Sequence, residues 1–215
     1  MTATLHYIFD PLCGWCYGAA PLVHAAAQLP GLQIALHGGG MLTDARRRQI
    51  TPDWRDYVLP HDTRIAQMTG QEFGAAYRDG LLNEVGVWLD SAPPTTAILA
   101  AEQLGQKGLA MLEAIQHGHY VRGLHISELA VLADLAVELG LDRAAFDAAF
   151  AQLQTMPTQQ HIDQSRRLLQ AAGGQGFPTV LVQKTADAAY ERIDVSDWLG
   201  QPGPFAEALA GYLKA

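Results

Sequence analysis

The chain has 215 residues, of which 49% are hydrophobic and 17% charged, and its net charge is −8 at pH 7. This length and composition are typical of a folded globular protein and exclude a disordered chain. Nucleic acids and anionic membrane surfaces attract clustered Lys and Arg, so we expect neither as a partner of this acidic chain.

The one basic run, Arg46 to Arg48, is interpreted as a solvated turn or helix start rather than a phosphate-binding patch. No stretch approaches the ~18 to 20 continuous apolar residues of a membrane span. The first residues lack the basic segment and apolar core of a signal peptide. With Met1 as the native start, we expect a cytoplasmic protein, in which a disulfide is usually transient or catalytic.

The first 42 residues predict a strand, a helix and a second strand. The β-favouring run Leu5–Phe9 ends at the turn signal Asp10-Pro11. The alanine-rich amphipathic stretch Cys13–Leu29 predicts a helix, and Leu32–His37 alternates apolar and polar residues as a strand does.

From about Thr43 to Gly173 the apolar residues recur with helical spacing, and no convincing strand is present. The predicted helices of this block are Thr95–Leu104, Leu109–Tyr120, Ser127–Leu139, Arg143–Gln154 and Thr158–Ala171.

Strand character returns after this block, at Phe177–Gln183 and Tyr190–Ile193, before a last amphipathic helix at Pro204–Leu213. Strands from the two ends of the chain share one sheet only if the helical block is an insertion. We therefore predict an α/β domain of residues 1–42 and 174–215, with a helical insertion domain of residues 43–173.

The two cysteines, Cys13 and Cys16, lie in the stretch "FDPLCGWCYG" just after the first predicted strand. Dithiol exchange needs one ionised, accessible thiol and a second thiol within bonding reach. Two intervening residues at the first turn of a helix meet both needs, because the helix N-terminus lowers the pKa of the first thiol. The favoured interpretation is a redox pair with Cys13 as nucleophile and Cys16 as resolving thiol.

A metal site and two inert core cysteines are the alternatives. A closed zinc site needs four ligands, and the chain has no second C-x-x-C. Tyr17 follows Cys16, which excludes the C-x-x-C-H haem signature. We therefore expect no metal, and no cofactor beyond the redox-active disulfide itself.

The order of elements, the C-x-x-C after the first strand, Pro21 and the Gly-Phe-Pro-Thr of residues 176–179 resemble a thioredoxin fold. The long helical insertion makes the chain similar to the DsbA-like branch. Within it, "FDPLCGWCYG", "GLHISELAVLADLAVELGLD" and "GFPTVLV" are most similar to predicted cytoplasmic protein-disulfide isomerases related to FrnE and to 2-hydroxychromene-2-carboxylate isomerase.

The resemblance implies that Pro178 is a cis-proline packed against the active-site disulfide. It also implies that the backbone of Phe177 pairs with an extended substrate, and that Trp15 and Thr179 contact substrate as well. Trp15 carries no charge where DsbA has a histidine, so a milder redox potential is expected. Asp10 is either a proton relay for the resolving thiol or, the favoured interpretation, a turn residue.

The predicted function is a thiol-disulfide oxidoreductase of the reductase or isomerase type, acting on protein or peptide thiols and disulfides, with glutathione as a reductant that the sequence allows. The first alternative is a glutathione-dependent isomerase or transferase of the chromene-carboxylate isomerase or kappa-class type. The second is a non-catalytic chaperone or binding module. The aromatic residues Trp54, Tyr57 and Trp88 are interpreted as packing rather than as a groove.

Overall fold

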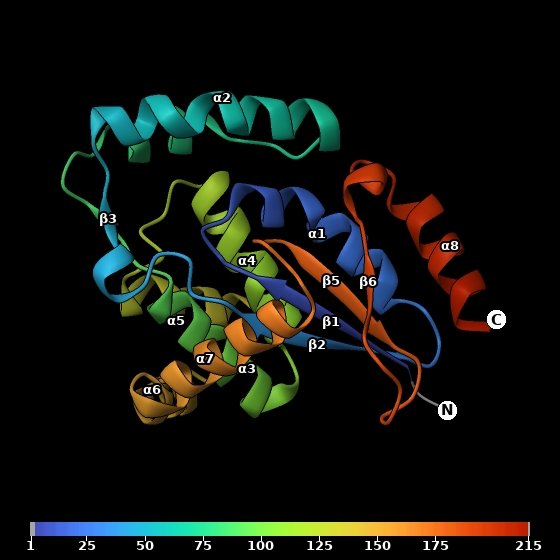
Figure 1. The fold of residues 1–215 in the computed structure, drawn as a ribbon. Helices are drawn as coiled ribbons and strands as arrows, with labels where there is room; N and C mark the ends of the chain where they lie inside the picture. Colours follow the sequence, from blue (N-terminus) through green and yellow to red (C-terminus); the bar gives the residue numbers. More distant parts are fainter. Residues whose placement is uncertain (1–2, 215) are drawn as a thin grey trace.

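The computed structural model of this chain describes residues 3–214 (Figure 1). Its main sheet has the order β2-β1-β5-β6. The central strand β1 runs parallel to β2 and antiparallel to β5, which in turn pairs antiparallel with β6. The strands are β1 (Ala3–Phe9), β2 (Leu32–Gly38), β5 (Thr179–Gln183) and β6 (Glu191–Ile193). The two ends of the chain therefore build one sheet, as predicted.

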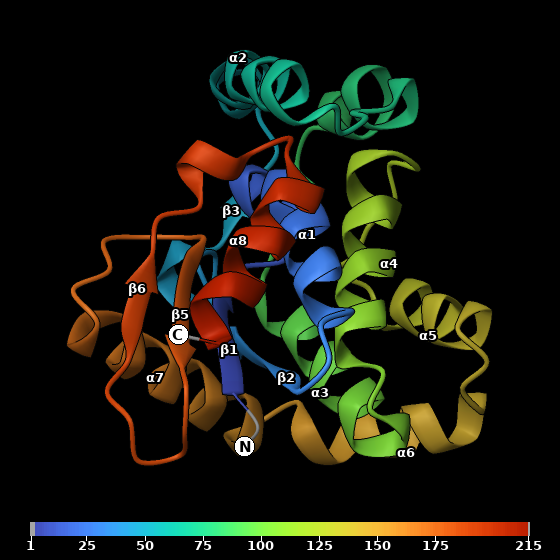
Figure 2. The same ribbon diagram turned by 90° about the vertical axis from the view of Figure 1, so that its right-hand side faces the viewer.

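Helices cover both faces of this sheet, so β1 is buried along almost its whole length (Figure 2). α1 (Gly14–Ala27) packs against α8 (Pro202–Lys214) on one face. α7 (Met156–Ala171) packs against β2 on the other face. α7 falls within the predicted insertion yet covers the sheet, and the division into two domains stays a prediction.

The remaining helices form a layer beside the sheet, and every helix predicted from residue 95 onward is present within a few residues of its expected ends. Gly140 and Gly173 have positive φ angles at the ends of α5 and α7, as helix-terminating glycines often do. The helices of this layer are α2 (Pro52–Thr69), α3 (Ala92–Gly105), α4 (Gly108–Tyr120), α5 (Leu129–Glu138) and α6 (Arg143–Leu153). In the described part of the chain, no helix is both long and apolar enough to cross a membrane.

Two features of residues 43–91 differ from the sequence prediction. A small antiparallel ladder joins β3 (Arg48–Gln49) to β4 (Trp88–Leu89), so the prediction of a block without strands is wrong at this point. Strands of two residues are too short to show an alternating pattern. The helix α2 was not predicted individually, because only Asp62 and Ile65 of its residues are buried and Pro60 lies inside it.

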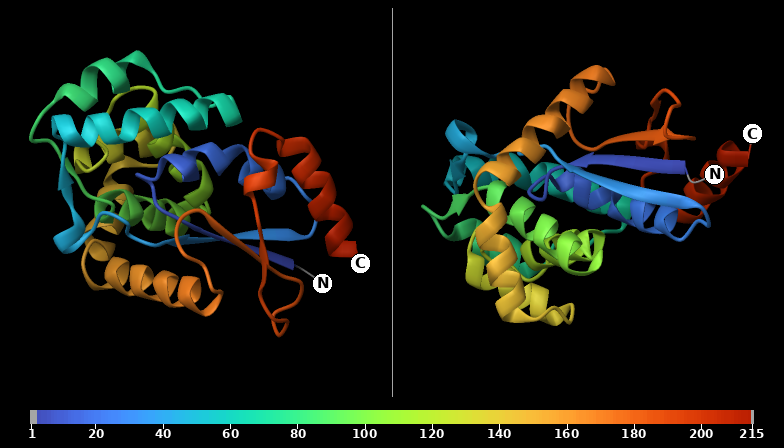
Figure 3. Two further views of the ribbon diagram at one scale, coloured as in Figure 1. Left: turned by 45° about the horizontal axis from the view of Figure 1, so that its top comes forward. Right: turned by 90° about the horizontal axis from the view of Figure 1, so that it is seen from below.

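α2 lies across the start of α1, where two glycines allow its close approach (Figure 3). Gly14 and Gly18 are four residues apart and therefore share one face of α1. A Cβ atom at Gly18 would lie 2.8 Å from Cγ2 of Ile65, and one at Gly14 would lie 3.0 Å from Cδ1 of Ile65. The contact between α1 and α2 therefore depends on the absence of side chains at both glycines.

Candidate active site

The two cysteines lie at the N-terminus of α1, as predicted. Cys13 is the N-cap residue, with extended backbone angles (φ −91°, ψ 113°), and Cys16 lies in the first helical turn. Both are free thiols in the structure. The helix begins at Gly14 and continues through Pro21. Cys13 therefore lies where the helix presents unpaired backbone N–H groups and the positive end of its dipole.

The two thiols differ in burial. Cys13 is 7% exposed and lines a cavity, whereas Cys16 is fully buried. Burial raises the pKa of the Cys16 thiol well above its usual value, and the hydrogen bond to Cys13 and the charge of Cys13 raise it further. Cys13 is therefore the thiol that a disulfide in the cavity can reach.

The peptide bond between Phe177 and Pro178 is cis, as predicted from the resemblance. The thiol of Cys13 donates a hydrogen bond to the carbonyl oxygen of Phe177, with 3.5 Å between sulfur and oxygen. The ring of Phe177 packs directly on Gly39, because a Cβ atom there would lie 2.2 Å from the ring. Arg166 donates a hydrogen bond from Nε to the carbonyl oxygen of Gly39 at 2.8 Å, which holds the segment that follows β2.

Asp10 is fully buried and serves as the predicted turn residue. Its Oδ1 accepts hydrogen bonds from the backbone N–H of Leu12 and from the hydroxyl of Ser91, both at 2.9 Å. Its Oδ2 accepts from the N–H of Met41. Burial raises the pKa of this carboxyl to about 6, although all three hydrogen bonds lower it. Its part as a proton relay for Cys16 stays a prediction.

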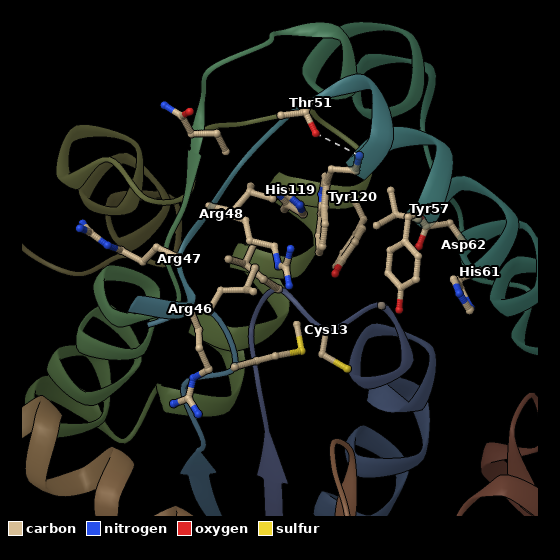
Figure 4. Close-up of a pocket in the computed structure, with 18 of the residues that line it drawn as sticks. Cys13, Arg46, Arg47, Arg48, Thr51, Tyr57, His61, Asp62, His119 and Tyr120 are labelled. Atoms are coloured by element: carbon tan, nitrogen blue, oxygen red, sulfur yellow. Dashed lines mark hydrogen bonds between the residues drawn. The ribbon is translucent and has the colours of Figure 1, made fainter. Parts of the chain in front are cut away.

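A cavity of about 1160 Å³ opens in front of Cys13, between the start of α1, the segment before β3, and α2 (Figure 4). The basic run interpreted as solvated is exposed, and it also lines this cavity. Arg48 is directed into the cavity on the side of Cys13, and its guanidinium carbon lies 5.6 Å from the ring centre of Trp54. Arg47 is directed away, 3.6 Å from a carboxylate oxygen of Asp90.

The opposite wall of the cavity is polar and aromatic. Oδ2 of Asp62 accepts a hydrogen bond from the hydroxyl of Tyr77 at 2.9 Å, and burial raises the pKa of this carboxyl to about 6. His119 packs against Tyr77 and Tyr120, and burial lowers the pKa of its imidazole to about 4, so it is neutral at pH 7. The wall thus has an ionisable group with a pKa near neutrality.

Of the seven predicted site residues, only Cys13 and Trp15 line the described part of the cavity wall. Trp54 and Tyr57, which were interpreted as packing, line it as well. Among the described residues, the cavity wall does not include Phe177 or Thr179, and the Thr179 hydroxyl donates to the carbonyl oxygen of Gly176 at 2.8 Å. The substrate contacts of Trp15, Phe177 and Thr179 stay predictions.

Sequence reasoning missed Asp62, Tyr77 and Arg166 altogether. These residues follow no motif, and they reach the site only when segments distant in the sequence dock. Asp62 lies on α2, Tyr77 in residues 76–80 and Arg166 on α7. The basic run was noticed, but its place at the cavity depends on the unpredicted pairing of β3 with β4.

The profile of the DSBA-like thioredoxin domain matches residues 4–201. The chain belongs to the DsbA-like thioredoxin family. This confirms the predicted fold class, a thioredoxin fold with a large helical insertion, and it agrees with the sheet order and the C-x-x-C at the start of α1.

Solved structures of other proteins agree with this membership. The cytosolic disulfide reductase DsbM from Pseudomonas aeruginosa is 47% identical, with 98% of each chain covered and a TM-score of 0.92. A structure of DsbM with GSH is 45% identical, covers 99% of this chain and 100% of that one, and has a TM-score of 0.91.

A 2-hydroxychromene-2-carboxylate isomerase, 18% identical over 98% of this chain and 96% of its own, has a TM-score of 0.58 and shares the fold alone. No curated protein sequence matches the chain. This DsbA-like protein is a thiol-disulfide oxidoreductase, as its family and its similarity to DsbM show.

Proposed function

We propose that this chain is a disulfide reductase in which Cys13 attacks the substrate, Cys16 resolves the mixed disulfide, and glutathione restores the dithiol. The observation that carries the proposal is the difference between the two thiols. Cys13 faces the cavity at a helix N-terminus, whereas Cys16 is fully buried behind it.

The reaction then proceeds in two exchanges. The Cys13 thiolate attacks one sulfur of the substrate disulfide, and the other sulfur leaves as a thiolate and takes up a proton. The Cys16 sulfur, after losing its proton, attacks Sγ of Cys13, which releases the second product thiol and forms the Cys13–Cys16 disulfide. Two glutathione molecules then reduce this disulfide to the dithiol and become glutathione disulfide.

We base the proposed direction of the reaction and the proposed location of the protein on its similarity to DsbM. DsbM is a cytosolic disulfide reductase, and its similarity extends over nearly the whole chain. Trp15 supplies no positive charge to stabilise the Cys13 thiolate, which agrees with a mild pair that a reducing cytoplasm keeps as dithiol. Reduction, in the cytoplasm, is therefore the direction we propose.

Glutathione suits the charges of the cavity. It carries two carboxylates, and Arg48 presents a guanidinium group beside Cys13. Guanidinium groups bind carboxylates through charge-assisted hydrogen bonds. The structure of DsbM with GSH supports the same ligand for this chain.

The test is turnover of glutathione mixed disulfides and protein disulfides by three proteins. Wild type should turn over both, and Cys13→Ser should lose both. Without glutathione, Cys16→Ala should stop after one exchange, with the mixed disulfide retained on Cys13. If both variants keep the activity of wild type, the proposal is wrong.

A second candidate, a glutathione-dependent isomerase or transferase, is favoured by the cavity surface that Trp54 and Tyr57 give to a small aromatic substrate. It requires turnover of such a substrate that survives Cys16→Ala. A non-catalytic binding module would instead bind its clients equally well after Cys13→Ser.

A further inference from the structure

A second buried carboxyl group, Asp62 on α2, faces the same cavity as Cys13. Asp62 is 5% exposed and lines the cavity. A Cβ atom built on Gly14, the residue after Cys13, would lie 3.1 Å from Oδ1 of Asp62. Asp62 therefore lies beside the first residue of the helix that carries the attacking thiol.

Disulfide exchange in this cavity needs a group that moves protons at the substrate sulfur. A leaving alkyl thiolate is basic, so a nearby acid that protonates it lowers the barrier. The same group, once ionised, accepts the proton of an incoming glutathione thiol. Efficient transfer requires a pKa near the working pH.

Asp62 meets these requirements and Asp10 does not. The three hydrogen bonds to Asp10 occupy both of its oxygens, and it is absent from the described cavity wall. Oδ2 of Asp62 is occupied by Tyr77, whereas Oδ1 has no hydrogen-bond partner among the described residues. Asp62 thus has one oxygen held in place and one available to a substrate.

We propose that Asp62 is the general acid and base that exchanges a proton with the substrate sulfur during thiol-disulfide exchange at Cys13. The inference rests on the proposed function. When the Cys13 thiolate attacks a disulfide, the S–S bond breaks, the leaving sulfur keeps its electron pair and takes the proton of Asp62. When glutathione enters, its S–H proton passes to the Asp62 carboxylate and its sulfur attacks Sγ of Cys13. The Cys13–Cys16 bond then breaks, and the Cys16 sulfur leaves with the electron pair and takes up a proton.

Tyr77 is the positioning residue for this group. Its hydroxyl holds Oδ2 of Asp62, and its ring packs against Phe73, His119 and Tyr120. The titratable and charged side chains that line the cavity with Asp62 include Cys13, Arg48, His61, Tyr77, His119 and Tyr120. Burial keeps the two tyrosines and His119 neutral at pH 7, so among these four buried groups Asp62 is the one whose proton changes near neutrality.

The test compares two disulfides whose leaving thiols differ in acidity. In single turnovers at pH 6, Asp62→Asn should slow reduction of bis(2-hydroxyethyl) disulfide on the order of 100-fold. It should leave reduction of 5,5′-dithiobis(2-nitrobenzoic acid) unchanged, because that leaving thiolate needs no proton. Alkylation of Cys13 by iodoacetamide, run alongside, corrects both rates for any change in thiolate fraction.

The controls separate chemistry from structure. Asp56→Asn removes an exposed carboxylate from the same helix and should react as wild type does with both disulfides. The ratio of wild-type to Asp62→Asn rates with bis(2-hydroxyethyl) disulfide should decline as the pH rises above about 6, where Asp62 loses its proton. Tyr77→Phe should shift the pH at which this decline occurs.

Three outcomes overturn the inference. If Asp62→Asn slows the reduction of both disulfides equally, Asp62 has a structural role. If it slows neither, another group transfers the proton. A higher KM for glutathione disulfide alone means that Asp62 binds the glutathione ammonium group. In each case wild type still exchanges disulfides through Cys13, whereas failure of the proposed function removes exchange from wild type itself.

Discussion

At the scale of single residues, burial decides which group does what. Cys13 and Cys16 have the same chemistry, but only Cys13 faces the cavity. Asp10 and Asp62 both have a carboxyl pKa raised to about 6 by burial, but only Asp62 keeps an oxygen free. The motif C-G-W-C therefore predicts the pair, and the difference in burial supports the order of attack that we propose.

The charge of Arg48 is expected to select substrates that carry carboxylates. Arg48→Gln should raise KM for glutathione disulfide roughly 10-fold, because a charge-assisted hydrogen bond contributes about 1.5 to 3 kcal/mol. KM for the uncharged bis(2-hydroxyethyl) disulfide should stay the same. Arg47→Gln is the matched control, since Arg47 is directed away from Cys13 (Figure 4). An equal rise in KM for both disulfides would show that Arg48 does not select substrates by their charge.

At the scale of elements, the cavity depends on how closely α2 approaches α1. Ile65 of α2 fits against Gly14 and Gly18 of α1, and the same approach brings Asp62 beside Gly14, the residue after Cys13. A substitution that adds a side chain at these glycines must move α2 or the tip of Ile65. The position of α2 thus sets both the width of the cavity and the place of its carboxyl group.

Two glycine-to-alanine variants test this packing. Gly211 of α8 has nothing within 4 Å of an added Cβ, so Gly211→Ala should stabilise the protein by about 0.5 to 1 kcal/mol through helix propensity. At Gly18 the new Cβ would lie 2.8 Å from Ile65 and 3.2 Å from Thr69. Gly18→Ala should therefore gain nothing or destabilise, as measured by urea unfolding. An equal gain at both positions contradicts the close contact of α1 with α2.

The sequence predicted the elements that have strong local signals. β-favouring runs indicated the four strands of the main sheet, and helical spacing indicated α6. The side chain of Asp142 caps α6 by accepting from the N–H of Ala145 at 2.9 Å. The C-x-x-C and Pro178 identified the two sides of the reacting centre. Each of these signals lies within a few neighbouring residues.

The missed features depend on contacts between distant segments. The β3–β4 ladder joins residues 48–49 to residues 88–89, and neither strand has a pattern of its own. Asp62 meets Tyr77 and lies beside Gly14 only after α2 has docked. An isolated aspartate in a polar helix has the same sequence signature whether it faces water or a reacting thiol.

At the scale of the whole molecule, the sheet and α7 enclose a group of histidines remote from the cysteines. Nδ1 of His6 lies 3.0 Å from Nε2 of His37, and Nε2 of His161 accepts from the N–H of Gly38 at 2.9 Å. Burial lowers the pKa of all three, that of His37 to about 4. The folded protein therefore holds these imidazoles neutral.

This arrangement predicts a loss of stability in mild acid. Between about pH 6.5 and 4 the unfolded chain binds protons at these histidines and the folded chain does not, so the free energy of unfolding falls as the pH falls. His37→Gln should reduce that fall by on the order of 1 to 2 kcal/mol between pH 7 and 5. Urea unfolding at each pH measures it, and the exposed His117→Gln is the control.

The buried carboxyl groups have the opposite effect on the free energy of unfolding over nearly the same pH range. Asp10 and Asp62 have a pKa raised to about 6, so the stability that their protonated forms give is lost as the pH rises through 6. Asp62→Asn should therefore make the acid loss of stability steeper than in wild type. A shallower loss in Asp62→Asn would contradict the raised pKa of this carboxyl.

The order of attack by Cys13 and Cys16 is tested most directly by the intact mass of the reduced protein after reaction with glutathione disulfide. Cys16→Ala should retain one glutathionyl group, and peptide mapping should place it on Cys13. Wild type should end as the Cys13–Cys16 disulfide without an adduct, and Cys13→Ser should remain unmodified. A stable adduct on Cys16, or an unmodified Cys16→Ala protein, would contradict the account.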